Sequence, residues 1–162
     1  MMGVNISKEY LDALITSQKQ FKTFPRREMA SERQFMRNEF EAYAPILDES
    51  FHVFMRQSIV FLENYSIGLV WNRKNDKPVI LFRCNGPHGG NENSSHRFVT
   101  HIHRLNLEEA AVNRFVETDT KETEEYTTFE DAAWFFLSYC GFRIEEIEKY
   151  FPFLRRMNLF GK

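Results

Sequence analysis

The sequence predicts an α+β protein in which a small antiparallel meander sheet is packed by an N-terminal helix and two or three C-terminal helices. Three observations predict this fold. Apolar residues recur at helical spacing over 8–22, apolar runs alternate with turn residues over 67–105, and helical spacing returns after residue 128. The length of 162 residues fits a single domain covering 1–162.

The N-terminal third begins with a helix expected over about 8–22. Ser7 is its expected N-cap, and Phe24-Pro25 is its expected end, because proline lacks an amide donor and restricts the residue before it. Residues 26–45 remain ambiguous between helix and strand, because their charges suit a helix while their aromatic residues and proline suit a strand and a turn.

Strands dominate the middle of the chain. Extended segments are expected at 51–56, 58–62, 67–71, 79–83 and 96–105. The segment 79–83 has the strongest strand signal, and the polar loop 85–95 that follows it contains three glycines. Residues 67–105 are therefore expected to form an antiparallel meander with one long polar loop.

The C-terminal third is expected to be mainly helical. Asn106 is the expected cap of a short helix over 107–114, and the acidic segment 117–125 is expected to be a solvated face or loop. Thr128 is expected to cap a longer helix that ends at Gly141. A further short helix is expected over 144–153.

Charge and cysteine content narrow the function classes. Twenty-one basic and 23 acidic residues give a formal charge of −2, so the total charge does not favour nonspecific nucleic-acid binding. Cys84 and Cys140 lack CxxC spacing, which argues against a zinc ribbon and predicts two buried, reduced thiols. With no signal-peptide pattern and no apolar run long enough for a bilayer, we expect a cytoplasmic protein without membrane contact.

Histidine clustering marks the candidate site. Four of the five histidines lie between positions 88 and 103, namely His88, His96, His101 and His103. Histidine is both an acid–base group near neutral pH and a frequent metal ligand. On a strand, His101 and His103 project from the same face, and an antiparallel neighbour would bring Arg83 close to them.

The predicted site has two groups of residues. The predicted catalytic residues are Arg83, His88, His101 and His103, and the predicted substrate-binding residues are Asn85, Gly86 and His96. His52 is expected to be a half-exposed residue outside the site. Cys84 is expected in the core, on one strand face with Ile80 and Phe82.

Three segments carry a resemblance to a known family. Val79-Ile80-Leu81-Phe82-Arg83, Asn85-Gly86-Pro87-His88 and His101-Ile102-His103 resemble the LRLDxNGPxH segment and HLHIY-like strand of an uncharacterised bacterial protein family. They are also distantly similar to the TumE-like toxins of bacterial toxin–antitoxin pairs. The resemblance covers about residues 45–145, and Cys84 or Asn85 stands where the family has an aspartate. It implies an α+β fold and a role in bacterial or phage conflict.

The first function that these residues suggest is that of a metal-independent ribonuclease or phosphodiesterase. His101 or His103 would take the proton from a 2′-hydroxyl, and His88 would protonate the leaving oxygen. Arg83 would stabilise the charge that builds up on the phosphoryl group. No cofactor is needed for this chemistry.

Two alternatives remain open at this point. His101, His103 and either His88 or His96 could bind zinc, with a water as the fourth ligand. The chain could also be a non-enzymatic binding protein, because many aromatic residues and a nearly neutral charge suit a protein partner such as an antitoxin or a defence factor. The oligomeric state stays open.

Overall fold

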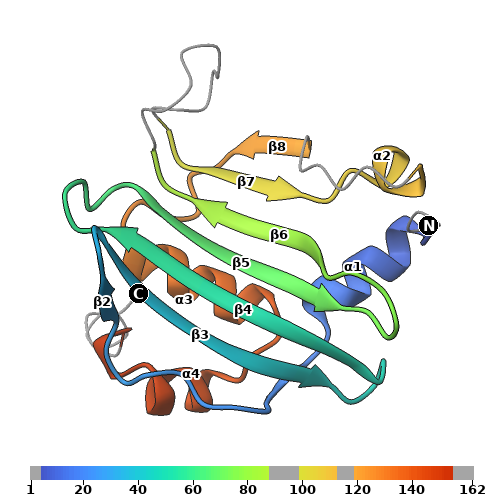
Figure 1. The fold of residues 1–162 in the computed structure, drawn as a ribbon, viewed down its shortest axis with the longest axis horizontal. Coiled ribbons are helices and arrows are strands. Elements are labelled where there is room, and N and C mark those ends of the chain that lie inside the picture. Colours follow the sequence, from blue (N-terminus) through green and yellow to red (C-terminus); the bar gives the residue numbers. More distant parts are fainter. Residues whose placement is uncertain (1–4, 88–98, 113–118, 155–162) are drawn as a thin grey trace.

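The computed structural model describes residues 5–87, 99–112 and 119–154 (Figure 1). Its strands are β1 (Gln20–Phe21), β2 (Ala30–Glu32), β3 (Phe35–Ala44), β4 (Glu49–Ser58), β5 (Tyr65–Asn72), β6 (Val79–Asn85), β7 (His101–Arg104) and β8 (Asp119–Glu122). Its helices are α1 (Lys8–Thr16), α2 (Leu107–Ala111), α3 (Phe129–Tyr139) and α4 (Ile144–Tyr150), followed by a short 3-10 turn at Pro152–Leu154.

The strands form one antiparallel sheet that follows chain order from β3 to β8. Its order is β1-β3-β4-β5-β6-β7-β8, and β2 also pairs with β3. Figure 1 shows α3 and α4 behind this sheet, with α1 beyond the end of β6. The predicted fold class, a meander sheet packed by an N-terminal helix and C-terminal helices, is therefore confirmed.

Alternating burial along the strands gives the sheet two different faces. Phe51, Val53 and Met55 of β4 are buried, whereas the residues between them are half-buried. The buried side faces the helices, where Phe82 of β6 stacks on Phe136 of α3 with ring centroids 5.9 Å apart. The other side carries no helix or strand of the described chain, and we call it the open face (Figure 1).

Helix ends follow their capping residues closely. Ser7, Asn106 and Thr128 each accept a hydrogen bond from the backbone amide three residues later, so all three predicted caps are confirmed. Gly141, with φ of 89°, ends the segment after α3 in a left-handed conformation that favours glycine. None of the helices in the described ranges has the length and apolarity that crossing a bilayer requires.

Three predicted helices are shorter than expected. The first ends at Thr16 rather than near residue 22, because Gln20 and Phe21 pair with β3 as strand β1. The short helix expected over 107–114 ends at Ala111. The last ends at Tyr150 rather than at residue 153. For the first helix, the pairing of Gln20 and Phe21 with β3 overrides helix propensity, whereas the last helix stops before Pro152, which disfavours a helical conformation for Phe151.

Two segments have a different structure from the one expected. Residues 58–62 are not a strand beyond Ser58, because the Ser58 hydroxyl accepts hydrogen bonds from the amides of Val60 and Phe61 and turns the chain. The acidic segment 117–125 contains β8, which pairs with β7 and is therefore not simply a loop. The ambiguous segment 26–45 forms β2 and β3.

Candidate active site on the open face

Two rows of side chains cross the open face of the sheet. Directly paired residues share a face, so the strand register defines each row. The first row runs from β3 to β8 as Arg37, Arg56, Ser66, Asn85, His101 and Glu122. The second runs beside it as Glu39, Phe54, Gly68, Arg83, His103 and Thr120.

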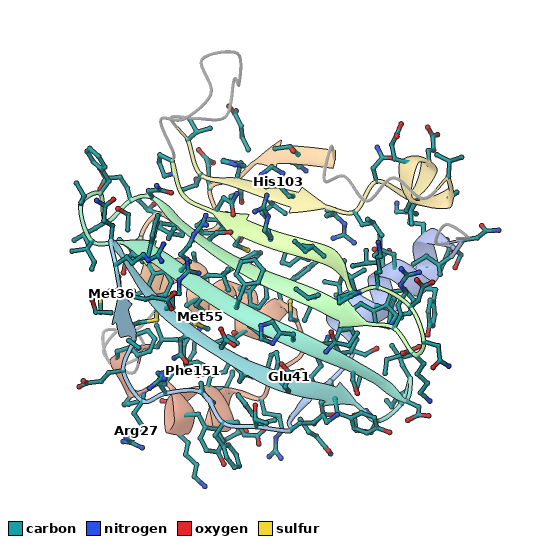
Figure 2. All side chains as sticks on the ribbon, in the orientation of Figure 1. Arg27, Met36, Glu41, Met55, His103 and Phe151 are labelled. Carbon is teal, nitrogen blue, oxygen red and sulfur yellow. The ribbon has the colours of Figure 1, made fainter. Side chains whose placement is uncertain are left out.

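Arg83, His101 and His103 are brought together where these rows cross β6 and β7. Arg83 pairs directly with His103, and the imidazole centroids of His101 and His103 are 4.8 Å apart in an edge-to-face arrangement. Figure 2 shows His103 on β7, beside β6. The structure thus juxtaposes three of the four residues that the sequence predicts as catalytic.

The two imidazoles differ in exposure and in their partners. His101 is fully buried, and its Nδ1 lies 2.9 Å from the Val99 carbonyl oxygen. A carbonyl accepts only, so Nδ1 of His101 must carry a proton. His103 is half-buried, and its Nδ1 lies 2.9 Å from the Thr120 hydroxyl. Of the pair, His103 is therefore the one that a ligand on the open face can reach.

Asn85 and Gly86 both lie at the end of β6. The Asn85 side-chain oxygen accepts a 2.7 Å hydrogen bond from the Ser66 hydroxyl, and Asn85 is only 6% exposed. A Cβ on Gly86 would lie 2.1 Å from the Glu63 carbonyl oxygen, so packing alone requires glycine there. The substrate-binding roles proposed for these two residues stay predictions.

A tyrosine from the other side of the sheet holds β6 and β7 together at this site. The Tyr126 hydroxyl lies 3.0 Å from the Asn85 carbonyl oxygen and 2.7 Å from the His101 carbonyl oxygen. Both oxygens belong to the strand pair that carries Arg83 and His103. Burial raises the pKa of Tyr126, so its hydroxyl stays protonated and keeps donating.

Two arginines that the sequence did not single out extend the site along the first row. Arg37 and Arg56 are direct cross-strand partners on β3 and β4. Their guanidinium carbons lie 5.7 and 5.2 Å from the centroid of the Phe35 ring. The alternation of apolar and polar residues within 51–56 could have placed Arg56 on the polar face of a strand. Its partner Arg37 could not be predicted, because the secondary structure of 26–45 was ambiguous.

A glycine lets an aromatic ring approach the open face of the sheet next to Arg83. A Cβ on Gly68 would fall 2.2 Å from the Phe54 ring and 3.1 Å from the Arg83 side chain. The Phe54 ring and the aliphatic part of Arg83 therefore meet above Gly68. The sequence does not reveal this contact between Phe54 and Gly68, because it depends on the pairing of β4, β5 and β6.

The remaining predicted residues fall outside this description or outside the site. His88 and His96 lie outside the described residues, so their roles stay predictions. His52 contacts Glu41 and is half-buried, as expected of a residue outside the site. Within the described ranges no three His, Cys, Asp or Glu side chains converge on a metal position, and the zinc alternative also needs His88 or His96.

A separate cavity lies on the helix side of β7 and β8. Its volume is about 1160 Å³, and its lining includes Ile102, Arg104, Phe135 and Tyr139. Arg83, His101 and His103 do not line it. The candidate site is therefore an exposed polar surface of the sheet, distinct from this cavity.

Comparisons with protein-family models, with curated proteins and with solved structures find no match to this chain. The resemblance to the TumE-like toxins therefore stays a prediction.

Proposed function

We propose that the chain cleaves RNA, with His103 as the acid–base group and Arg83 as the cation that stabilises the phosphoryl charge. The observation that carries the proposal is their direct cross-strand pairing on the open face, where both side chains are partly exposed. A guanidinium beside an imidazole combines a phosphate-binding cation with a proton acceptor that works near neutral pH. Both side chains are half-buried, which keeps them partly ordered while a substrate can still reach them.

His103 is the proton acceptor in this mechanism. Neutral His103 takes the proton of a 2′-hydroxyl, and the 2′-oxygen attacks the adjacent phosphorus. The bond to the 5′-oxygen breaks, which leaves a 2′,3′-cyclic phosphate and a 5′-hydroxyl. Arg83 stabilises the charge on the phosphoryl oxygens, and His88 is the proposed donor of the proton to the leaving oxygen.

Thr120 and His101 position His103 from two sides. The proposed base requires Nδ1 of His103 to donate to the Thr120 hydroxyl oxygen, 2.9 Å away, so that Nε2 is the nitrogen that accepts the proton. The buried His101 ring packs edge-to-face against His103 and is held in place by the Val99 carbonyl. A fixed ring orientation is what positional catalysis requires.

The decisive experiment compares His103→Ala with His52→Ala on a fluorescent single-stranded RNA. We expect His103→Ala to lose about 100-fold to 10,000-fold in cleavage rate, the range typical of an acid–base group. His52→Ala is the matched control, since His52 lies on the same face but pairs with Glu41. Thermal unfolding should show both variants folded.

Two results would contradict the proposal. One is full cleavage by His103→Ala. The other is cleavage of an RNA whose 2′-oxygens are all methylated, because such a substrate has no internal nucleophile. Cleavage by the wild-type chain should also persist in EDTA, whereas loss of activity in EDTA would favour the zinc alternative.

A second candidate, a protein-binding role, is favoured by an exposed apolar loop. Ile59, Val60, Phe61 and Leu62 are consecutive and between 44% and 65% exposed. Contiguous exposed apolar residues often mark a protein interface. The chain's effect on its host cell would then survive the replacement of both Arg83 and His103 but be lost in Phe61→Ser. That outcome would favour protein binding over RNA cleavage.

A further inference from the structure

Arg37 and Arg56 form a like-charge pair that the fold itself does not explain. They are directly opposite each other on β3 and β4, and like charges at such positions destabilise a sheet. Both are stacked near Phe35, which offsets part of that cost through cation–π attraction. A pair that costs stability and is partly exposed on the open face is a candidate for anion binding.

The hydrogen-bonding state of these guanidiniums points the same way. The Nε atoms of Arg37 and Arg56 are both buried, and neither has a hydrogen-bond acceptor among the residues that the structure describes. Arg37 has one long ion pair, 3.7 Å, with Glu32, and no ion pair of Arg56 is found within the described ranges. Burial lowers the pKa of Arg56, and the positive charges of Arg37 and Arg83 lower it further.

Phe54 lies between this pair and the proposed cleavage point. Phe54 and Arg56 are two residues apart on β4 and therefore share the open face. The Phe54 ring reaches across Gly68 to the Arg83 side chain. An aromatic ring flanked by guanidiniums on both sides matches the combination that stacks bases and neutralises phosphates in single-stranded nucleic-acid sites.

From this arrangement we infer that Arg37, Arg56 and Phe54 form a subsite for single-stranded RNA beside the cleavage point. Arg56 lies two strands away from Arg83, roughly 10 Å across the sheet. That separation suits the phosphate of a neighbouring nucleotide. The inference rests on the proposed function for its choice of RNA, and the subsite deepens that function.

The surrounding charges and the shape of the face favour a single strand. Glu39 ends the second row beyond Phe54 and would repel a phosphate, so the backbone is expected to follow the Arg56 row. A sheet face that presents the partly exposed Phe54 ring suits splayed bases, whereas duplex RNA hides its bases in a stack. We therefore expect preference for a single strand over the matching duplex.

The test uses a fluorescein-labelled, fully 2′-O-methylated single-stranded decamer, which the proposed chemistry cannot cleave. Fluorescence anisotropy should show Arg56→Gln, Arg37→Gln and Phe54→Ala each weakening binding about tenfold. The slope of log Kd against log salt concentration should fall by about 0.7 for each arginine removed. Arg143→Gln is the matched control, because the exposed Arg143 lies at the start of α4, away from the open face.

The melting temperature of each variant distinguishes a loss of RNA binding from a loss of folding. Arg56→Gln removes a like-charge contact, so its melting temperature should equal or exceed that of the wild type while its affinity falls. Unchanged affinity in Arg56→Gln and Arg37→Gln, or tighter binding of the duplex, would overturn the subsite. Affinity lost equally in Arg143→Gln would also overturn it, because the loss would then reflect total charge alone.

The two proposals fail separately. If the decamer binds as described but RNA is never cleaved, the subsite stands and the catalytic proposal falls. If RNA is cleaved through His103 while the arginine variants bind normally, the catalytic proposal stands and the subsite falls.

Discussion

At the scale of single residues, Gly68 and Gly86 show two different reasons for a glycine in this sheet. A Cβ on Gly86 would meet backbone, the Glu63 carbonyl oxygen at 2.1 Å. A Cβ on Gly68 would meet the end of the Phe54 ring at 2.2 Å. The Glu63 carbonyl belongs to the hydrogen-bonded turn that leads into β5 and has little freedom to move, whereas a side chain can change its rotamer.

We therefore expect Gly86→Ala to be the more destabilising of the two substitutions. Overpacking typically costs 1–3 kcal/mol, so Gly86→Ala should lose about 3 kcal/mol and Gly68→Ala about 1 kcal/mol. Urea unfolding measures both values. Gly68→Ala should instead weaken binding of the 2′-O-methyl decamer, because it displaces Phe54. Equal stability losses would contradict this distinction.

Residue-scale prediction was right for Cys84 and wrong for its companion Ile80. Cys84 and Phe82 are buried, as expected, but Ile80 is half-buried and pairs with Val70 on the open face. The register shifts at Leu69 and Val70, so Leu81 is an extra residue in β6. Beyond such a bulge, the side chains that would face the core face the opposite side of the sheet. The periodicity of the sequence does not reveal where a bulge occurs.

At the scale of elements, Lys19 connects the end of α1 to the end of α3. Its Nζ donates to the carbonyl oxygens of Ile15, Ser17 and Cys140 at 2.8, 3.0 and 2.7 Å. The carbonyls near the last turn of a helix lack intrahelical donors, and a lysine ammonium satisfies them. Lys19 is completely buried, and burial lowers its pKa to about 8.

We expect Lys19→Met to destabilise the protein by about 2 kcal/mol at pH 7, because three carbonyls lose their donor. The stability of the wild type relative to this variant should rise between pH 8 and 10.5. In that window the folded chain binds fewer protons than the unfolded chain, whose lysine titrates near 10.5. Urea unfolding at a series of pH values measures the difference. If the difference in unfolding free energy between the wild type and Lys19→Met did not change with pH, the three carbonyls would offset the effect of burial on the pKa of Lys19.

At the scale of the whole molecule, the helices and the candidate site lie on opposite faces of one sheet. The helix side buries both cysteines, and burial raises the pKa of Cys84 and raises that of Cys140 to about 12. The open face holds Arg56, Arg83 and His103. Substitutions on the open face can therefore alter function without disturbing the core.

The core placement of the thiols predicts how they react with Ellman's reagent. Thiolate is the reactive form, and burial both disfavours it and blocks access. We expect almost no reaction in the folded protein and two thiols titrated after denaturation. A fast reaction of one thiol in the native state would contradict the helix-side packing of the sheet.

Local patterns alone determined a large part of this protein. The caps Ser7 and Thr128, the strand at 79–83 and the common face of His101 and His103 all follow from spacing over a few residues, so the sequence predicts them directly. Only the tertiary structure decided that Arg83 pairs with His103 and that Arg56 and Phe54 lie in the adjacent positions. The physical reason is that strand register depends on the sum of contacts between segments far apart in the chain. The bulge at Leu81, which shifts the register between β5 and β6, is decided in the same way.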